Sequence, residues 1–269
     1  MSHVTFLNPQ ALANALGEYA PAVAVTLYDT VDSTNTAAKA AATAATAAST
    51  APALYVARAQ TGGRGRLGRS FHSPADTGLY MTVAYTTDRP LTEAVRVTAE
   101  AAVAAVSAIE SLTDKRPAIK WVNDLYLNGA KVAGILTEAV TLPEGGTRMV
   151  VGLGINLTTT QFPDGLRAPA SCLFSPDEAA RVTPELLGSL AGTITRNLLT
   201  LVAEDPQAPA CPDFYRRHLL YVGSPVQCTR GSEVFEGIVR GVTEDYALLV
   251  EVNGEVRALS SGEISVRAL

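Results

Sequence analysis

The stretch QTGGRGRLGRSF, Gln60 to Phe71, constrains the fold of this chain more than any other segment. Its glycines spell G-x-G-x-x-G, the fingerprint of dinucleotide-binding folds, in which a helix must follow the first glycine directly. Here the chain continues as RSFHSPADTG, and Pro74 and Gly78 interrupt any helix that begins there. No G-K-[ST] follows the glycines, as a P-loop requires. The segment therefore argues against both a Rossmann domain and a P-loop domain.

Three arginines stand among these glycines, namely Arg64, Arg66 and Arg69. Glycines let backbone N–H groups approach an anion, and arginines fork onto phosphate or carboxylate oxygens. The loop is thus predicted to bind an anionic ligand and to become ordered around it. A solvated surface loop stays the alternative, because runs of charge usually lie on solvated faces. RNA binding is disfavoured, because the formal net charge is −5 and no aromatic residues interleave with the arginines.

The composition indicates a folded protein of the cytosol. Of the 269 residues, 47% are hydrophobic and 17% charged, so the chain can bury a sizeable core. Cys172, Cys211 and Cys228 lie far apart, which favours reduced thiols over a disulfide framework or a zinc site. We find no signal peptide and no strongly apolar stretch long enough to span a bilayer. We expect a cytoplasmic protein without a DNA or membrane partner.

Hydrophobic periodicity predicts strands and helices without a regular β-α alternation, which places the first part of the chain in the α+β class. Strands are expected at residues 53–60, 78–86, 118–140 and 148–156, the third folded back at an Asn128-Gly129 hairpin. Helices are expected after the D-S-T-N segment, over 92–112 and from a Thr183 N-cap onward. One buried stripe is predicted along the second helix, formed by Val95, Ala99, Ala102, Val106 and Ile109.

The last fifty or so residues change character. Several short strands follow one another there, with Asn253-Gly254 as a hairpin turn and other turn residues at intervals of about eight to twelve positions. This pattern is typical of a small β-barrel or meander. We therefore expect a domain boundary near Tyr221.

The sequence resembles the biotin protein ligases. Five motifs occur in that family's order and approximate spacing: DSTN, QTGGRGRLGRSF, KWVNDLYL, KVAGILTE and GLGIN. The resemblance implies a catalytic domain over residues 1–220, similar to class II aminoacyl-tRNA synthetases, with a mixed sheet flanked by helices. It implies a small SH3-like β-barrel over 221–269. Because only about thirty residues precede DSTN, the chain resembles the monofunctional type without the DNA-binding domain.

The resemblance also implies a two-step reaction with ATP, biotin and Mg²⁺. Biotin is first activated as biotinyl-5′-AMP, and a lysine on the biotin carboxyl carrier domain of an acyl-CoA carboxylase then takes the biotinyl group. The first step brings two anions together, so positioning and charge stabilisation should dominate the catalysis. Relatives of this type are monomers or homodimers, and the sequence does not choose between the two states.

Biotin binding is implied for residues that match the family's motifs: Ser33, Thr34, Asn35, Gln60, Gly63, Arg64, Gly65, Arg66, Lys120, Gly134 and Ile135. ATP binding is implied for Arg69, Phe71, Lys120, Asn123 and Asn156, and metal binding for Asp124. Lys131 is implied to line the biotin side. Simpler interpretations stay open for several of them. The Ser33–Asn35 segment could only cap a helix, Phe71 could be core, Gly134 could mark a bulge, and Asn156 could end a strand.

Lys120, Arg64 and Arg66 are the predicted catalytic residues. A lysine in the apolar stretch AIKWVND is either an exposed guard of a sheet edge or a deliberately placed cation. The resemblance favours the second role, with Lys120 bridging the carboxylate of biotin and the α-phosphate. Val122 stands where the family usually has proline, which leaves the shape of this turn open.

Two rival functions remain at this stage. A lipoate or octanoyl transferase shares the catalytic fold, but it would lack the arginine-glycine loop in this form. A non-catalytic binding module could use the loop to grip an anionic peptide. Lys120, together with the complete set of motifs, argues against that module.

Overall fold

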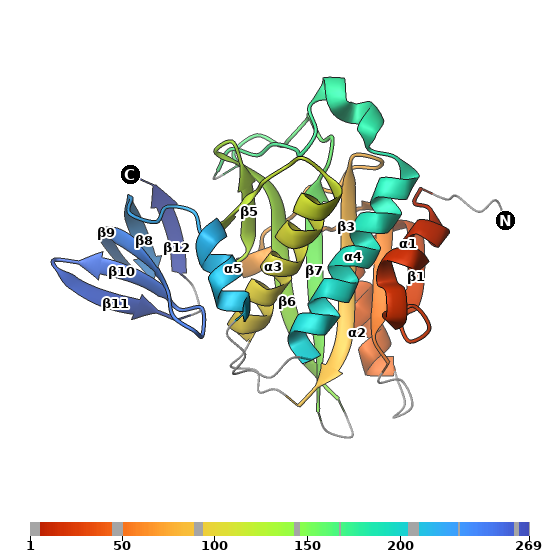
Figure 1. The fold of residues 1–269 in the computed structure, drawn as a ribbon, viewed down its shortest axis with the longest axis horizontal. Coiled ribbons are helices and arrows are strands. Elements are labelled where there is room, and N and C mark those ends of the chain that lie inside the picture. Colours follow the sequence, from red (N-terminus) through yellow and green to blue (C-terminus); the bar gives the residue numbers. More distant parts are fainter. Residues whose placement is uncertain are drawn as a thin grey trace.

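The computed structural model describes residues 6–44, 51–88, 94–142, 146–166, 168–203, 210–230, 232–260 and 264–268. Two sheets organise these residues (Figure 1). The larger sheet has seven strands in the order β1-β2-β3-β7-β6-β5-β4. Its strands are β1 (Ala24–Val31), β2 (Ala53–Gln60), β3 (Gly78–Thr87), β4 (Ala118–Lys120), β5 (Asp124–Leu127), β6 (Ala130–Thr141) and β7 (Thr147–Asn156).

Only β1 and β2 pair in parallel, and the other neighbouring strands of this sheet pair antiparallel. The loop after Gln60 therefore connects β2 to its antiparallel neighbour β3 rather than leading into a helix. This arrangement confirms the predicted α+β class with a mixed sheet. It also confirms that the G-x-G-x-x-G pattern here is not a Rossmann turn.

Helices cover both faces of the larger sheet (Figure 1). In front lie α1 (Pro9–Leu16), α3 (Ala94–Leu112) and α4 (Pro184–Ala203), and behind lies α2 (Thr34–Ala44). Alternate residues of β7 separate the two faces, since Val151, Leu153 and Ile155 belong to the main core while Gly152 and Gly154 face the α2 side. The main core thus fills the front, and the back is free to carry polar groups and a cleft.

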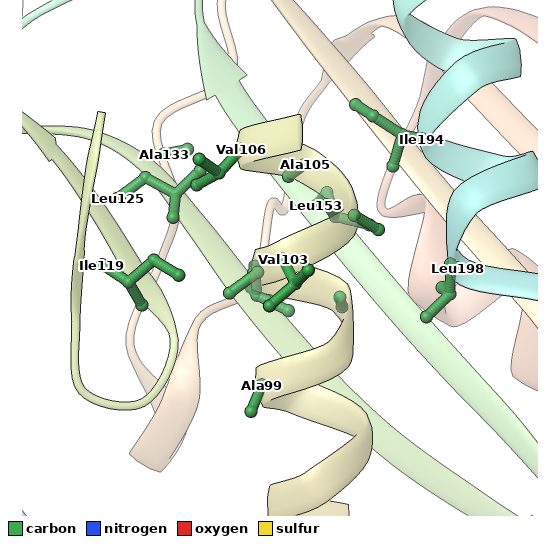
Figure 2. Close-up of a cluster of buried hydrophobic side chains, with 14 of the residues drawn as sticks. Ala99, Val103, Ala105, Val106, Ile119, Leu125, Ala133, Leu153, Ile194 and Leu198 are labelled. Atoms are coloured by element: carbon green, nitrogen blue, oxygen red, sulfur yellow. The ribbon is translucent and has the colours of Figure 1, made fainter. Parts of the chain in front are cut away.

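The α3 helix is buried almost all round, which corrects the prediction of a single apolar stripe. Val103 and Val106 pack toward Ile119 and Leu125, on the side where Figure 2 also shows Ala133. The opposite side of α3 packs against α4, so its alanines are buried too. Val95, one member of the predicted stripe, is only partly buried. The periodicity missed this because alanine scarcely distinguishes a second buried face from an exposed one. The predicted helix start at Thr92 lies outside the described residues.

The α4 helix begins as predicted, with Pro184 as its first residue and the Thr183 hydroxyl accepting from the backbone N–H of Leu186 at 3.2 Å. By length and composition alone, it would be long and apolar enough to cross a membrane. In this structure it is a core helix, because Leu190, Ile194 and Leu198 are fully buried against the rest of the fold.

The stretch predicted as one strand before the Asn128-Gly129 turn is two strands, β4 and β5, which pair antiparallel. The chain turns between Lys120 and Asp124, and the peptide bond from Trp121 to Val122 is cis. Trp121 leaves the sheet because its ring is buried and its indole N–H donates to the carbonyl of Tyr246 at 2.7 Å. The predicted Asn128-Gly129 hairpin is confirmed, with both residues at positive φ. β7 runs through its glycines to Asn156, where the strand predicted over 148–156 ends.

The smaller sheet is antiparallel, with strand order β11-β10-β9-β8-β12. Its strands are β8 (Pro225–Arg230), β9 (Glu233–Val242), β10 (Leu248–Val252), β11 (Glu255–Leu259) and β12 (Ile264–Ala268). The Asn253-Gly254 turn joins β10 to β11 as predicted. The helix α5 (Ala210–His218) precedes this sheet and lies between it and α3 (Figure 1).

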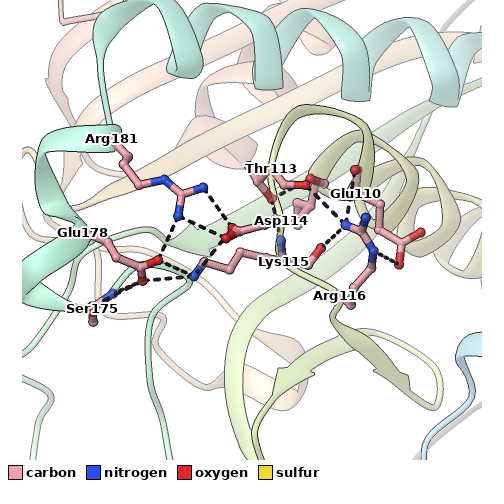
Figure 3. A network of polar contacts seen from close by, with 9 residues as sticks. Glu110, Thr113, Asp114, Lys115, Arg116, Ser175, Glu178 and Arg181 are labelled. Atoms are coloured by element: carbon pink, nitrogen blue, oxygen red, sulfur yellow. Dashed lines mark hydrogen bonds and ion pairs between the residues drawn. The ribbon is translucent and has the colours of Figure 1, made fainter.

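Short 3₁₀ helices complete the fold at Gly17–Tyr19, Arg66–Gly68 and Pro176–Arg181. The last of these is held by an ion-pair network (Figure 3). Lys115 donates to both carboxylate oxygens of Glu178, at 2.7 and 2.9 Å, and Arg181 contacts both Glu178 and Asp114. The network fastens the segment that follows β7 to the turn at the end of α3.

Candidate active site

A cleft of about 830 Å³ opens on the α2 side of the larger sheet. The start of α2, the loop after β2 and the strands β4 to β7 form its wall, and Tyr221, Val266 and Arg267 extend it toward the smaller sheet. Its size is that of a small-molecule site. All the site residues predicted from the sequence line this cleft except Gly63. Motifs separated by up to about 120 positions in the chain therefore meet in one place.

The cleft is strongly cationic although the whole chain is acidic. Among the residues that the structure describes, six positively charged side chains line it: Arg64, Arg66, Arg69, Lys120, Lys131 and Arg267. Among the described residues of the wall, Asp124 is the sole carboxylate, and its Oδ1 accepts from Lys131 at 2.6 Å. Such a concentration of positive charge in a partly enclosed space attracts anions. Anion binding, predicted from the sequence for the loop alone, is therefore expected of the whole cleft.

The arginine-glycine loop folds back on itself at the mouth of the cleft. The N–H of Gly65 donates to the carbonyl of Arg69 at 2.7 Å, and the N–H of Phe71 donates to the carbonyl of Gly63 at 2.8 Å. Arg66 reaches across to the turn between β4 and β5, where its guanidinium donates to Oδ1 of Asn123 at 3.0 Å. Burial lowers the pKa of Arg66, which indicates a desolvated cation. The loop therefore closes one side of the cleft.

Phe71 lies over two glycines in the floor of the cleft. Gly134 of β6 and Gly154 of β7 are directly paired across the sheet. A Cβ atom at Gly154 would overlap the ring of Phe71, and one at Gly134 would lie 3.3 Å from it. The ring is only partly buried and lines the cleft, so Phe71 is not ordinary core. The two glycines therefore make room for the ring of Phe71, on which an aromatic ligand in the cleft could stack.

The start of α2 is fixed to the end of β2. Gln60 accepts the backbone N–H of Thr34 with its Oε1 at 2.9 Å, and its Nε2 donates to the Ser73 hydroxyl at 2.9 Å. Ser33, Thr34 and Asn35 are each less than 5% exposed. The segment is thus a helix start, as the simpler interpretation held, and it also forms part of the cleft wall.

Lys120 is half-buried at the end of β4, an edge strand of the sheet, and it lines the cleft. Its Nζ lies 3.3 Å from the hydroxyl of Tyr126 and 5.1 Å from the centre of that ring. Burial lowers the pKa of Lys120, Asp124 acts to raise it, and Lys131 and Arg267 lower it further. The side chain is therefore a cation held in an unfavourable place rather than an exposed edge guard.

Asn156 carries a buried acceptor that the protein leaves without a partner among the described residues. Its Nδ2 donates to the carbonyl of Ser171 at 3.0 Å, which fixes the orientation of the amide. The Oδ1 atom is buried and has no hydrogen-bond partner in that part of the chain, and the residue lines the cleft. A buried acceptor of this kind costs free energy unless a ligand donates to it.

The wall also contains residues that sequence reasoning did not single out as site residues, among them Tyr126, Tyr221 and Arg267. Tyr126 follows the KWVND motif closely and could have been included from that position. Nothing near Arg267 in the sequence marks it, because the packing of β12 beside the larger sheet brings it close to Lys120. Ile135 lines the cleft, but its side chain belongs to the core in front of the sheet, so it offers the cleft mainly backbone.

No group of three or more His, Cys, Asp or Glu side chains that could hold a metal ion occurs among the described residues. In the described part of the wall Asp124 alone offers a carboxylate, and Oδ1 of Asn123 already accepts from Arg66. Mg²⁺ is commonly held by one or two carboxylates together with the phosphates of a nucleotide. The residues present therefore fit an ion that arrives with its substrate and do not fit a resident metal.

Comparisons with known proteins identify relatives of this chain. A profile of the Biotin/lipoate A/B protein ligase family matches residues 27–156, and a profile of the biotin protein ligase C terminal domain matches 221–267. The biotin--[acetyl-CoA-carboxylase] ligase of Paracoccus denitrificans is 31% identical over 224 residues, covering 79% of this chain and 89% of the relative.

The bifunctional ligase/repressor BirA of Bacillus subtilis is 29% identical, and the match covers 79% of this chain and 66% of that longer relative. Among solved structures, the biotin protein ligase from Aquifex aeolicus in complex with biotin and ATP is similar in fold. Its TM-score is 0.68 at 24% identity, with 91% of this chain and 99% of that chain covered.

Proposed function

Since the chain belongs to the biotin/lipoate A/B protein ligase family, we propose that it is an ATP-dependent biotin protein ligase. It activates biotin as biotinyl-5′-AMP and transfers the biotinyl group to a lysine of a biotin carrier domain of a carboxylase. The observation that carries the proposal is the meeting of six cations and a buried acceptor in one cleft. We propose that residues 1–220 form the catalytic domain and 221–269 a C-terminal β-domain, in a cytoplasmic protein.

The first step joins two anions, so the cations of the cleft supply its main requirement. An oxygen of biotin's carboxylate attacks the α-phosphorus of ATP, the bond to the β-phosphate oxygen breaks, and pyrophosphate leaves. Lys120 is half-buried in the cleft wall and would hold the carboxylate and the α-phosphate together as charge builds. Arg64 and Arg66 would close over the two groups from the loop. Mg²⁺ would neutralise phosphate charge when bound, with Asp124 as its protein ligand.

The second step needs little further machinery. The neutral amine of the carrier lysine attacks the acyl carbon of biotinyl-5′-AMP, the acyl–phosphate bond breaks, and AMP leaves with the electron pair. Adenylation has already made the acyl group reactive, so the protein has to hold the adenylate and exclude water from it. The loop over residues 60–71 is placed to do both.

The nucleotide base fits the end of the cleft where Phe71 and Asn156 lie. Adenine would stack on the ring of Phe71 above the glycine floor. Its exocyclic amino group would donate to the unpartnered Oδ1 of Asn156. Biotin would occupy the other end, near the start of α2 and Gln60, with its carboxylate directed toward the loop and Lys120.

Mass spectrometry of an acceptor domain tests the proposal. The protein is mixed with ATP, Mg²⁺, biotin and a biotin carrier domain, with parallel reactions that contain lipoate and a lipoyl carrier domain or that lack ATP. A gain equal to biotin minus water, seen only with biotin and ATP, is the expected result. A gain with lipoate alone would move the protein to the lipoate side of the family. No gain with either would contradict ligase activity.

A further inference from the structure

A row of polar side chains lies behind the part of the cleft that we assign to biotin. The row, called the polar chain below, consists of Lys39, Glu138, Asn35, Thr82 and Thr34. Thr82 is fully buried, and Asn35 and Thr34 are 4% and 3% exposed. Only Thr34 and Asn35 belong to the cleft wall, among the residues that the structure describes. The proposed reaction gives the other three members no role.

Gly152 makes room for the polar chain in the middle of the sheet. It lies in β7 between Thr82 of β3 and Leu136 of β6, on the face toward α2. A Cβ atom at Gly152 would overlap Oδ1 of Asn35. The amide of Asn35 therefore packs flat against the backbone of the central strand, where it cannot turn freely.

The partners of Asn35 determine which way its amide points. Its Nδ2 lies 2.9 Å from Oε2 of Glu138 and 3.3 Å from the carbonyl oxygen of Leu136. Both of these oxygens can only accept, so the NH₂ group must face them. The opposite atom, Oδ1, then faces the hydroxyl of Thr82 at 2.7 Å.

Glu138 is held in its ionised form. Partial burial acts to raise its pKa, but hydrogen bonds from Lys39 and Asn35 and the nearby charges of Lys39 and Arg64 lower it overall. The ammonium of Lys39 lies 2.6 Å from Oε1. An ionised carboxylate has no proton to donate, so it enforces one orientation of Asn35.

The fixed amide sets the direction of the two hydroxyls that follow. The Thr82 hydroxyl lies 2.7 Å from Oδ1 of Asn35 and 2.8 Å from the Thr34 hydroxyl, and it has one proton for these two neighbours. Because Oδ1 can only accept, the proton of Thr82 goes to Asn35. The Thr34 hydroxyl then donates to Thr82, at 2.8 Å, rather than to Oε1 of Gln60, at 3.2 Å, and its lone pairs are left for the cleft.

A second acceptor lies beside the first. Oε1 of Gln60 accepts from the backbone of Thr34 and lies 3.2 Å from the Thr34 hydroxyl oxygen. Its amide is also fixed, because Nε2 donates to the Ser73 hydroxyl, which in turn donates to the carbonyl of Phe71. The wall thus presents two neighbouring acceptors, which favour N–H groups on the ligand.

We propose that Glu138 and Thr82 are positioning residues that set the hydrogen-bond polarity of the biotin pocket, so that Thr34 accepts a ligand N–H. The proposal rests on the proposed function and deepens it. The ureido ring of biotin carries N–H donors, whereas the dithiolane ring of lipoate has none. Glu138 and Thr82 would therefore favour biotin without touching it, because they act through Asn35 and Thr34.

Removing the Thr82 hydroxyl tests the proposal. In Thr82→Val the proton of Thr34 turns to Gln60 and occupies the second acceptor. The KM for biotin should rise about three- to tenfold, the loss expected for one hydrogen bond, while kcat and the KM for ATP stay near wild type. Thr82→Ser restores the hydroxyl and should restore the KM for biotin. Thr195→Val removes a fully buried hydroxyl that donates only within α4, and it serves as the matched control.

Glu138→Gln tests the direction of the same hydrogen bonds with a side chain of nearly unchanged volume. It is the variant to use if Thr82→Val does not fold. Lys39 and Asn35 both donate to Glu138, and a glutamine cannot accept from both in the same places. Its NH₂ group would turn toward Asn35 and reverse the polar chain, raising the KM for biotin in the same range. Wild-type turnover with an unchanged KM for biotin in both variants would overturn the positioning role. Failure of the wild type to biotinylate a carrier would instead overturn the proposed function.

Discussion

Lys120 is a residue whose position in the fold disfavours its own charge. Its ammonium is partly buried next to two other cations, Lys131 and Arg267, and its pKa is lowered as a result, first of all by burial. Asp124 offsets part of this effect but is itself bound to Lys131. A partly buried cation in a cleft is best explained by an anionic ligand that binds there and balances its charge.

We predict that Lys120→Ala lowers the rate of adenylate formation by about 10²- to 10³-fold, the usual effect of losing one preorganised charge contact. The melting temperature should stay the same or rise, because the alanine removes a desolvated cation. Pyrophosphate release and thermal melting measure the two effects. Lys120→Arg, which keeps the charge, should retain more activity than the alanine variant. A normal rate in Lys120→Ala would remove this residue from the mechanism.

Asn156 supports a prediction about the nucleotide rather than about the chemistry. Its unpartnered Oδ1 matches the donor on adenine, whereas guanine presents an acceptor at the same place. Asn156→Ala should raise the KM for ATP about three- to tenfold and reduce the preference for ATP over GTP. The KM for biotin should not change. Steady-state kinetics with both nucleotides gives the answer, and an unchanged KM for ATP would place adenine elsewhere.

The cleft residues that were predicted each lie in a motif whose local chemistry is unusual. Arginines among glycines and a lysine in an apolar stretch stand out in any sequence. Glu138 and Thr82 could not be singled out in this way, because a glutamate or threonine in a strand is ordinary. Their proposed role depends on Gly152, which lets three strands and a helix bring them together.

At the scale of elements, turns and caps were easier to predict than burial. The Asn128-Gly129 and Asn253-Gly254 turns and the start of α4 follow from local backbone preferences. The two burying faces of α3 depend on helices far away in the chain. The break between β4 and β5 depends on Trp121, whose partner is 125 residues away. Such effects of tertiary packing leave little trace in a local pattern.

The short helix Pro176–Arg181 supports a prediction about pH. Hydrogen bonds from Lys115 and Ser175 and the charge of Lys115 lower the pKa of Glu178 to about 2, although desolvation acts to raise it (Figure 3). Because its pKa is lower in the folded state, the network stabilises the protein above the ordinary pKa of glutamate, and this stabilisation is lost as the pH falls toward 2.

Glu178→Gln should therefore lower the melting temperature at pH 7, and its difference from wild type should shrink as the pH falls from about 4.5 toward 2. Thermal melting at pH 7, 5 and 3 measures this trend. Asp177→Asn removes a neighbouring carboxylate of the same helix and should have the smaller effect. A difference between Glu178→Gln and wild type that does not depend on pH would contradict the role of this charge.

At the scale of the whole molecule, one hydrophobic core joins the two sheets. The main cluster contains Val151 and Leu153 of the larger sheet as well as Val239 and Val250 of the smaller one. Trp121 extends from the turn after β4 to the carbonyl of Tyr246. Lys120 lies directly before this tryptophan, and Arg267 of β12 lines the same cleft. The packing of the smaller sheet therefore determines the shape of the cleft near the proposed catalytic lysine.

We accordingly predict that the two sheets unfold together. Trp121 is the one tryptophan of the sequence, so the fluorescence emission of the wild-type protein reports directly on this interface. In a urea titration, its shift to longer wavelength should share a midpoint with the loss of circular dichroism at 222 nm, which reports mainly on the helices. Saturating biotin and ATP should raise both midpoints equally. A fluorescence transition at lower urea than the circular dichroism transition would show that the smaller sheet separates first. The shape of the cleft near Lys120 would then depend on a docking equilibrium, and adenylate formation should fall at the same urea concentration as the fluorescence shift.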